Sequence, residues 1–257
     1  MHRWGILIRG YIVRRYVAVI KPAAEHVALR SKCSIRLAGF YVETNPLCIL
    51  ISWAYKIEVA NSSPFTTQRP RCGTELYGST SAGGSYGSGT VFQLKRSKSG
   101  WTENILYNFQ GGNDGNVPYA GVILDHSGNL YGGATGGGTG GGGTIFELTP
   151  SSGGWTFSVL YNLAGSPVSG PFRNLKMDAS GNLYGTTHCD GAYSDGTVYK
   201  LTPSGGTWTY TSLYVFTGGA DGYYSFSNLV FDKQGNLYGT TIYGGTNVYG
   251  VAFKITP

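Results

Sequence analysis

Large apolar residues alternate with smaller or polar ones in short runs along residues 73–257. One run is bounded by Gly and Ser, and its large side chains fall at every second position: Trp155, Phe157, Val159, Tyr161 and Leu163. Alternation with a period of two over a short run predicts a β-strand with one buried face. We therefore expect these five side chains to share one face of a strand.

Internal copies of a second run sharpen the assignment of faces. In the run TVYKL at residues 197–201, Tyr199 and Leu201 point one way and Lys200 the other. The Tyr199 position is large and aromatic in the other copies, whereas the Lys200 position varies: Phe92, Phe146 and Phe253 against Gln93, Glu147 and Lys254. A constant apolar face opposite a variable polar face is typical of a half-buried strand. We expect the aromatic face to be buried.

The strands recur at a fixed interval. The tripeptide Leu-Tyr-Gly stands at residues 76–78, 130–132, 183–185 and 237–239, with intervals of 54, 53 and 54 residues. Trp101, Trp155 and Trp208 keep the same step. The interval from Trp155 to Pro203 contains four short alternating runs and no helical period. A repeat of this length predicts stacked supersecondary units that bury their faces against one another.

These features predict an all-β, β-propeller-like fold with four-stranded blades that repeat every 53–54 residues. A β-solenoid is the alternative, but its coils usually have shorter periods, and a sandwich does not need such similar copies. The predicted strands fall short of four complete blades. We therefore expect an incomplete or fragmentary propeller, or one that part of residues 40–72 completes.

The motifs LDHSGNLYGGATGGG, MDASGNLYGTT and FDKQGNLYGTT resemble the GloVer tandem repeat of bacterial choice-of-anchor proteins. The resemblance covers about residues 73–257. It implies a glycine-rich, propeller-like repeat protein that is secreted or attached to the cell surface, and it brings no established activity, cofactor or catalytic residue. The chain departs from the pattern in two ways: no anchor follows the repeats, and AGSPVSG replaces one GGxDG loop.

Charge divides the chain into two segments. The formal net charge is +6, but residues 73–257 hold eight Lys and Arg against ten Asp and Glu. The positive charge therefore lies in residues 1–72, and the repeats lack the basic surface that binding to nucleic acid needs. We predict a basic, non-repeat segment at 1–72 and a repeat domain at 73–257. Because charge, glycine and cysteine content change together at this junction, we hypothesise that residues 1–72 are non-native, from a shifted reading frame or a wrong start.

The apolar runs near the N-terminus are too short or too interrupted for a signal peptide or a membrane span. Arginines break the first run, and PLCILISWAY reaches only about half the length of a spanning helix. We therefore expect no membrane span and identify no signal peptide.

An Asp-x-x-Gly-Asn motif precedes three of the four Leu-Tyr-Gly copies. Asp can bond to the backbone two residues further on, and Gly can adopt positive φ, so the motif predicts a tight turn rather than an acid or a metal ligand. The predicted turn residues are Asp125, Gly128, Asn129, Asp178, Gly181, Asn182, Asp232, Gly235 and Asn236.

Candidate chemistry is sparse. The glycine-rich residues 132–144 precede a strand rather than a helix, which argues against a phosphate cradle. The acids occupy non-equivalent places, the two repeat-region histidines do not match, and no zinc or calcium motif is present. We expect no cofactor, metal or catalytic residues. Two roles are open for Asp114 and Asp221 in the GGxDG loops: they stabilise a turn, or they bind an ion weakly.

The tyrosines of the Leu-Tyr-Gly motif have two interpretations: Tyr77, Tyr131, Tyr184 and Tyr238. They pack between blades, or they form platforms on which sugar rings stack. The sequence predicts a non-catalytic extracellular repeat module for surface interaction or carbohydrate binding. The alternative is a propeller enzyme of the metal-dependent lactonase or glycan lyase type. The expected partner is a carbohydrate or a cell-surface polymer, and the oligomeric state is open.

Overall fold

The computed structural model describes residues 33–37, 40–44, 56–58, 75–165 and 169–257. The chain divides into two units, residues 1–47 and 48–257. In the first unit, β1 (Cys33–Leu37) and β2 (Phe40–Thr44) form an antiparallel hairpin. Most of the non-repeat segment at 1–72 lies outside the described residues, and the hypothesis about its origin stays a prediction.

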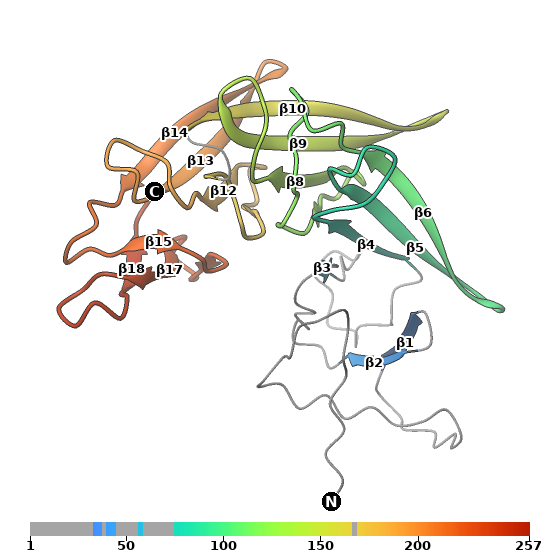
Figure 1. Cartoon of the computed structure of the whole chain (residues 1–257), viewed down its shortest axis with the longest axis horizontal. Helices are drawn as coiled ribbons and strands as arrows, with labels where there is room; N and C mark the ends of the chain where they lie inside the picture. Colours follow the sequence, from blue (N-terminus) through green and yellow to red (C-terminus); the bar gives the residue numbers. More distant parts are fainter. Residues whose placement is uncertain (1–32, 38–39, 45–55, 59–74, 166–168) are drawn as a thin grey trace, which may run out of the picture. The chain divides into compact units, whose positions relative to one another are not determined.

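The second unit contains four antiparallel four-stranded sheets that follow one another along the chain (Figure 1). The first sheet comprises β3 (Lys56–Glu58), β4 (Glu75–Thr80), β5 (Thr90–Ser97) and β6 (Gly100–Asn108). The second comprises β7 (Ile123–Leu124), β8 (Leu130–Ala134), β9 (Gly141–Ser151) and β10 (Gly154–Ala164). The third comprises β11 (Lys176–Met177), β12 (Leu183–Thr186), β13 (Thr197–Ser204) and β14 (Thr207–Val215). The fourth comprises β15 (Tyr223–Ser225), β16 (Val230–Phe231), β17 (Leu237–Tyr243) and β18 (Ala252–Ile255).

The fold confirms the all-β, propeller-like prediction. No helix occurs among the described residues, and the second, third and fourth sheets are each built from one repeat of the sequence. A strand from residues 40–72 completes the first sheet, because β3 pairs with β4 from Lys56↔Ser79 to Glu58↔Tyr77. In the first three sheets the strands lie in chain order, and the tryptophan strands β6, β10 and β14 form one edge. In chain order, the tryptophan strand is therefore the last strand of each of these three sheets and not the first.

The hydrophobic core lies between successive sheets. Tyr77 and Val91 of the first sheet pack with Phe146 and Leu148 of the second. The interface between the second and third sheets is built in the same way around Tyr131 and Tyr199, and the next one around Tyr184 and Leu237. Each sheet thus covers a face of its neighbour, as the repeat predicts.

Because of a β-bulge, the large side chains of β10 do not share one face as predicted. Val159 pairs with Phe146, but the next paired residue, Tyr161, lies opposite Ile145, so the register shifts by one residue. Trp155 and Phe157 therefore pack toward the first sheet, whereas Tyr161 and Leu163 pack toward the third. The prediction of one shared face was wrong because alternation in a sequence does not reveal an extra residue in one strand.

Candidate functional site

Three of the Leu-Tyr-Gly tyrosines lie on faces that meet the following sheet, and Tyr238 has the equivalent position in the fourth sheet. Tyr77, Tyr131 and Tyr184 are buried, whereas Tyr238, in the fourth sheet, is 40% exposed. The Tyr77 and Trp155 rings meet edge-on with centroids 6.1 Å apart, and Tyr131 and Trp208 repeat this contact at 6.0 Å. Three of these rings are thus covered by the next sheet, and Tyr238 alone of the four offers a large free surface.

Each tyrosine hydroxyl in this motif donates a hydrogen bond to a carboxylate. Tyr184 and Tyr238 donate to Asp178 and Asp232 at 3.0 Å, and Tyr131 donates to Glu147 at 2.9 Å. For the buried Tyr131 and Tyr184, the carboxylate supplies the hydrogen-bond partner that water would supply to an exposed hydroxyl.

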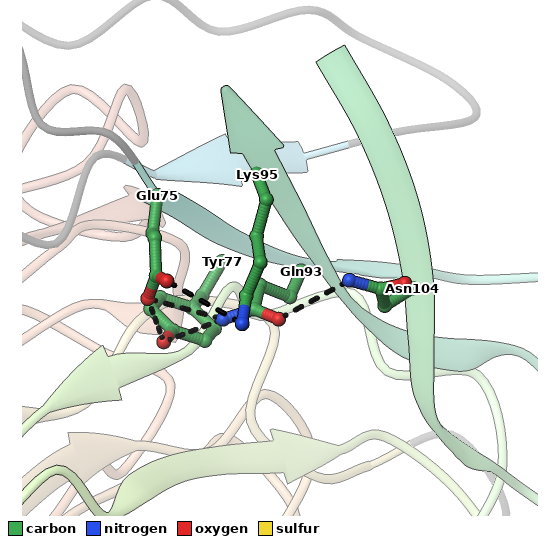
Figure 2. A network of polar contacts seen from close by, with 5 residues as sticks. All are labelled: Glu75, Tyr77, Gln93, Lys95 and Asn104. Atoms are coloured by element: carbon green, nitrogen blue, oxygen red, sulfur yellow. Dashed lines mark hydrogen bonds and ion pairs between the residues drawn. The ribbon is translucent and has the colours of Figure 1, made fainter. Parts of the chain in front are cut away.

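The first sheet lacks the turn aspartate, and Glu75 replaces it (Figure 2). Tyr77 donates to Glu75 Oε2 at 2.8 Å, and Gln93 Nε2 donates to both the Tyr77 hydroxyl and Glu75. Lys95 Nζ lies 3.6 Å from Glu75 Oε1. Asn104 Nδ2 is 3.5 Å from Gln93 Oε1 at the far side of the network. Each of these side chains has a hydrogen-bond or ion-pair partner within the network, so we interpret the network as structural.

The three Asp-x-x-Gly-Asn segments form the same turn. The backbone N–H groups of Ser180 and Asn182 both donate to Asp178 Oδ1 at 2.9 Å, and Asn182 Nδ2 donates to Oδ2 at 2.7 Å. Gly181 has a φ of +81°. The same bonds recur around Asp125 and Asp232.

The GGxDG aspartates also close their own loops. Asp114 Oδ2 accepts from the Tyr107 hydroxyl at 2.9 Å and from the Gln110 backbone N–H at 2.7 Å. Asp221 accepts in the same way from Tyr214 and from Thr217. Each carboxylate thus accepts hydrogen bonds from its own loop and from a tyrosine of the preceding strand.

The loops at the end of the sheets opposite the Asp-x-x-Gly-Asn turns form a second candidate surface. We call it the rim: residues 81–89, 135–140, 187–196 and 244–251, with residues 110–117 and 217–222. Backbone bonds join these loops, as between Val117 N and Ser88 O at 3.0 Å and between Gly245 N and Gly219 O at 3.1 Å. The rim sequence contains Asp114, Asp190, Asp195 and Asp221 and no Lys or Arg.

Exposed tyrosines stand at the tips of three rim loops. Tyr86 is 60% exposed, Tyr193 is 61% exposed and Tyr249 is 89% exposed. Tyr86 and Tyr193 occupy equivalent positions, each three residues before the glycine that precedes the next strand. Gly, Ser, Thr, Asn and Asp make up most of the surrounding loop residues. These tyrosines do not stand out in the sequence, because the aromatic residue is not present at this position in all four repeats.

A ladder of aromatic residues runs across three sheets beside their short first strands. Tyr119 stacks on Phe172 with ring centroids 5.4 Å apart, and Phe172 lies 4.7 Å from Phe226. Asparagines hold these segments together: Asn174 Oδ1 accepts from Gly121 N at 3.0 Å, and Asn228 Oδ1 accepts from Asn174 N at 3.3 Å. The aromatic residues are 53 and 54 positions apart and the two asparagines 54 apart, and this spacing is the sequence signal that could have revealed them.

His188 lies where the rim meets this ladder. Its ring centroid is 4.2 Å from that of Tyr224 and 5.2 Å from that of Phe172. Burial raises the pKa of the Cys189 thiol, so this thiol is not activated as a nucleophile. Burial lowers the pKa of the neighbouring His188, which favours its neutral form. Within the described residues, no group of three His, Cys, Asp or Glu side chains is placed to hold a metal ion.

A groove of about 520 Å³ lies between the third and fourth sheets. Tyr184 and Met177 line one side, and Phe231 lines the other. Thr256 and Pro257, which follow β18, complete the wall. At the two preceding interfaces, the equivalent tyrosine contacts a tryptophan of the next sheet.

A family model described as the Gloeobacter/Verrucomicrobia repeat matches residues 68–257. The chain belongs to this repeat family. The match confirms the GloVer resemblance and extends it slightly toward the N-terminus. No helix of the described residues is long and apolar enough to cross a membrane.

Other comparisons add little to the family assignment. A search of curated proteins finds no match to the chain. One solved structure, of a protein with a suggested gluconolactonase activity, aligns with a TM-score of 0.37 at 15% identity. The alignment covers 60% of this chain and 51% of that protein, so the chain spans about half of its length.

Proposed function

We propose that this member of the Gloeobacter/Verrucomicrobia repeat family is a non-catalytic extracellular module that binds a carbohydrate or another cell-surface polymer through its rim. The exposed rings of Tyr86, Tyr193 and Tyr249 support this proposal. Aromatic faces suit stacking on sugar rings, and the neighbouring hydroxyl, amide and backbone groups supply hydrogen bonds. Several similar loops on successive sheets would give avidity on a polymer.

The charge of the rim favours a neutral or cationic polymer over nucleic acid. Its four aspartates meet no Lys or Arg within the rim sequence, so a phosphate backbone gains no favourable contact there. Two of the aspartates, Asp114 and Asp221, are committed to loop closure. The remaining rim chemistry is that of a binding surface rather than of a pair of convergent catalytic acids.

Retention on insoluble polysaccharides tests the proposal. We expect the full chain to be retained by at least one polysaccharide in a panel that includes cellulose, chitin and xylan. Replacement of Tyr86, Tyr193 and Tyr249 together by Ser should abolish retention without lowering the melting temperature, because these side chains are exposed. Tyr238→Ser is the matched control on another surface.

Each outcome separates the alternatives. Loss of retention in Tyr238→Ser alone would place the ligand on the Leu-Tyr-Gly tyrosines. Equal retention of the rim variant and the unmodified chain would contradict the rim assignment, and no retention on any polysaccharide would contradict carbohydrate binding.

A further inference from the structure

A cation lies at the aromatic ladder of Tyr119, Phe172 and Phe226. The guanidinium carbon of Arg173 stands over the Phe226 ring, 5.0 Å from the ring centroid. Arg173 Nε donates a hydrogen bond to the Phe226 carbonyl oxygen at 2.6 Å. These two contacts fix the position of the guanidinium group beside the ladder. The two Nη atoms of Arg173 make no hydrogen bond to any residue that the structure describes.

The charge of Arg173 has no counter-charge in the described part of the chain, where no carboxylate lies within ion-pair distance of it. The side chain is only partly exposed, and burial lowers the pKa of its guanidinium group. Arginine nevertheless stays charged in proteins. Because partial burial of an unpaired cation costs free energy, the Nη atoms are placed to gain from an anion that binds here.

The segments that carry the ladder differ in charge from the rim. We call them the first-strand segments: residues 117–124, 171–177 and 225–231. They contain Arg173 and Lys176 and no Asp or Glu. The positions equivalent to Arg173 hold Ala120 and Ser227, so the repeat does not require a cation there. An anionic group that the acidic rim repels therefore meets a local positive charge at the ladder.

The ladder also presents an accessible aromatic surface. Tyr119 is 42% exposed, and it is held in place by stacking on Phe172. A ring that is already positioned loses little conformational freedom when a ligand packs on it. Tyr119 and Arg173 belong to the second and third sheets, each of which packs against a neighbouring sheet on both sides. An aromatic face next to a guanidinium group suits a ligand that combines an apolar ring face with a carboxylate.

We propose that the aromatic ladder and Arg173 form a second binding site, and that its ligand is a single hexuronic acid residue. The sugar ring packs on the ladder at Tyr119 and Phe172, and the carboxylate accepts hydrogen bonds from the Nη atoms of Arg173. One acidic residue is favoured over a polyanion, because the rim that meets the ladder is acidic. This inference goes beyond the proposed function, since the rim tyrosines take no part in the site.

A pair of matched sugars tests the proposal on the full chain. Methyl glucuronide and methyl glucoside differ only in the carboxylate that replaces the hydroxymethyl group. We expect the glucuronide to bind about tenfold more tightly or better in ligand-observed NMR titrations, because hydrogen bonds to a charged group are the stronger ones. Added sodium chloride should reduce this preference, since the ion pair is partly exposed.

Two variants separate the charge from the ring. Arg173→Gln should abolish the preference for the glucuronide and leave glucoside binding unchanged, whereas Arg173→Lys should keep part of the preference. Tyr119→Ser should weaken the binding of both sugars, because it removes the stacking surface. Tyr193→Ser, a rim variant, is the matched control and should bind both sugars as the unmodified chain does. The melting temperature of each variant checks its fold.

The outcomes also distinguish this site from the rim. The variant with Tyr86, Tyr193 and Tyr249 replaced by Ser should bind the glucuronide unchanged, even if the unmodified chain is retained by no polysaccharide. Loss of glucuronide binding in that variant would overturn the existence of a separate site. A preference that survives Arg173→Gln would overturn the role of the guanidinium group, and undiminished binding by Tyr119→Ser would overturn the role of the ladder. Equal binding of the two sugars, or binding of neither, would overturn the proposal.

Discussion

The Phe146 ring lies over the α-carbon of Gly132 in the paired strand, so that a β-carbon on Gly132 would be 2.5 Å from Phe146 Cζ. Tyr199 lies over Gly185, and Phe253 lies over Gly239, in the same way. The glycine of Leu-Tyr-Gly is thus required by the aromatic residue of the next strand. This cross-strand pair explains why the two motifs recur together.

Gly132→Ala is therefore expected to lower the free energy of unfolding by about 1–3 kcal/mol, since the new methyl group must displace a fully buried ring. Urea unfolding measures the change. Gly153→Ala is the matched control: nothing lies within 4 Å of a β-carbon there, and a change within about 0.5 kcal/mol is expected. If the ring causes the loss, Phe146→Leu should relieve part of it in the double variant. Additive losses would contradict the paired role.

The loss of stability on truncation of the aromatic residue should be larger where that residue is more deeply buried. Phe146→Ala is expected to cost about 3–5 kcal/mol, because the ring is fully buried between the first and second sheets. Phe253→Ala should cost less, because Phe253 is only partly buried. Equal losses in thermal melts or urea unfolding would contradict this difference between the second and fourth sheets.

Tyr199 is the one member of this aromatic set that carries a hydroxyl. The ring is fully buried, and its Oη has no hydrogen-bond partner among the described residues. Tyr199→Phe should therefore raise the free energy of unfolding by about 1–2 kcal/mol, because it removes a buried polar group that bonds to nothing. Tyr210→Phe is the control, since the Tyr210 hydroxyl lies 3.3 Å from Thr197 Oγ1 and its loss should not stabilise. A destabilised Tyr199→Phe variant would show that the hydroxyl has an unseen partner.

Period and alternation in the sequence were sufficient to predict the strands, the four-stranded sheets and the buried position of Phe146. They could not predict the bulge after Val159, because an extra residue leaves the apolar pattern of β10 unchanged. The rim tyrosines could not be predicted from the repeat either, since Gly140 replaces the aromatic residue in the second repeat. Their exposure depends on how each loop leaves its sheet, which local sequence does not determine.

Gly181→Ala tests the turn geometry. The φ of +81° is costly for a residue with a β-carbon, and no atom lies within 4 Å of that position, so the penalty is conformational. We expect a loss of about 1–2 kcal/mol in urea unfolding. Gly181→Asn should cost clearly less, because Asn tolerates the left-handed region. Equal costs for the two variants would show that the turn relaxes to another conformation.

The turn aspartates predict a loss of stability in acid. The Asn236 side-chain hydrogen bond is the main cause that lowers the pKa of Asp232 to about 2, and bonds from the Asn236 and Gln234 backbone and from Tyr238 add to it. A pKa that is lower in the folded state gives stability that is present above the unfolded value of 3.8 and is lost as pH falls toward 2. Urea midpoints measured between pH 5 and 2 should fall less for Asp232→Asn than for the unmodified chain. Parallel curves would contradict this contribution.

Because of the buried tyrosine hydroxyls, we expect the stability of the fold to fall as pH rises in the alkaline range. Burial raises the pKa of Tyr77 and of Tyr184 to about 12, and hydrogen bonds to the Glu75 and Asp178 carboxylates add to the shift. Because the folded pKa exceeds the unfolded value of 10.0, the stabilisation is complete below about pH 10 and is lost as pH rises through 12. Tyrosinate absorbance should show a late phase that disappears when the chain is unfolded in urea. Tyr184→Phe should remove part of this phase and reduce the fall in urea midpoint above pH 10. An unchanged titration in that variant would show that Tyr184 ionises without cost to the fold.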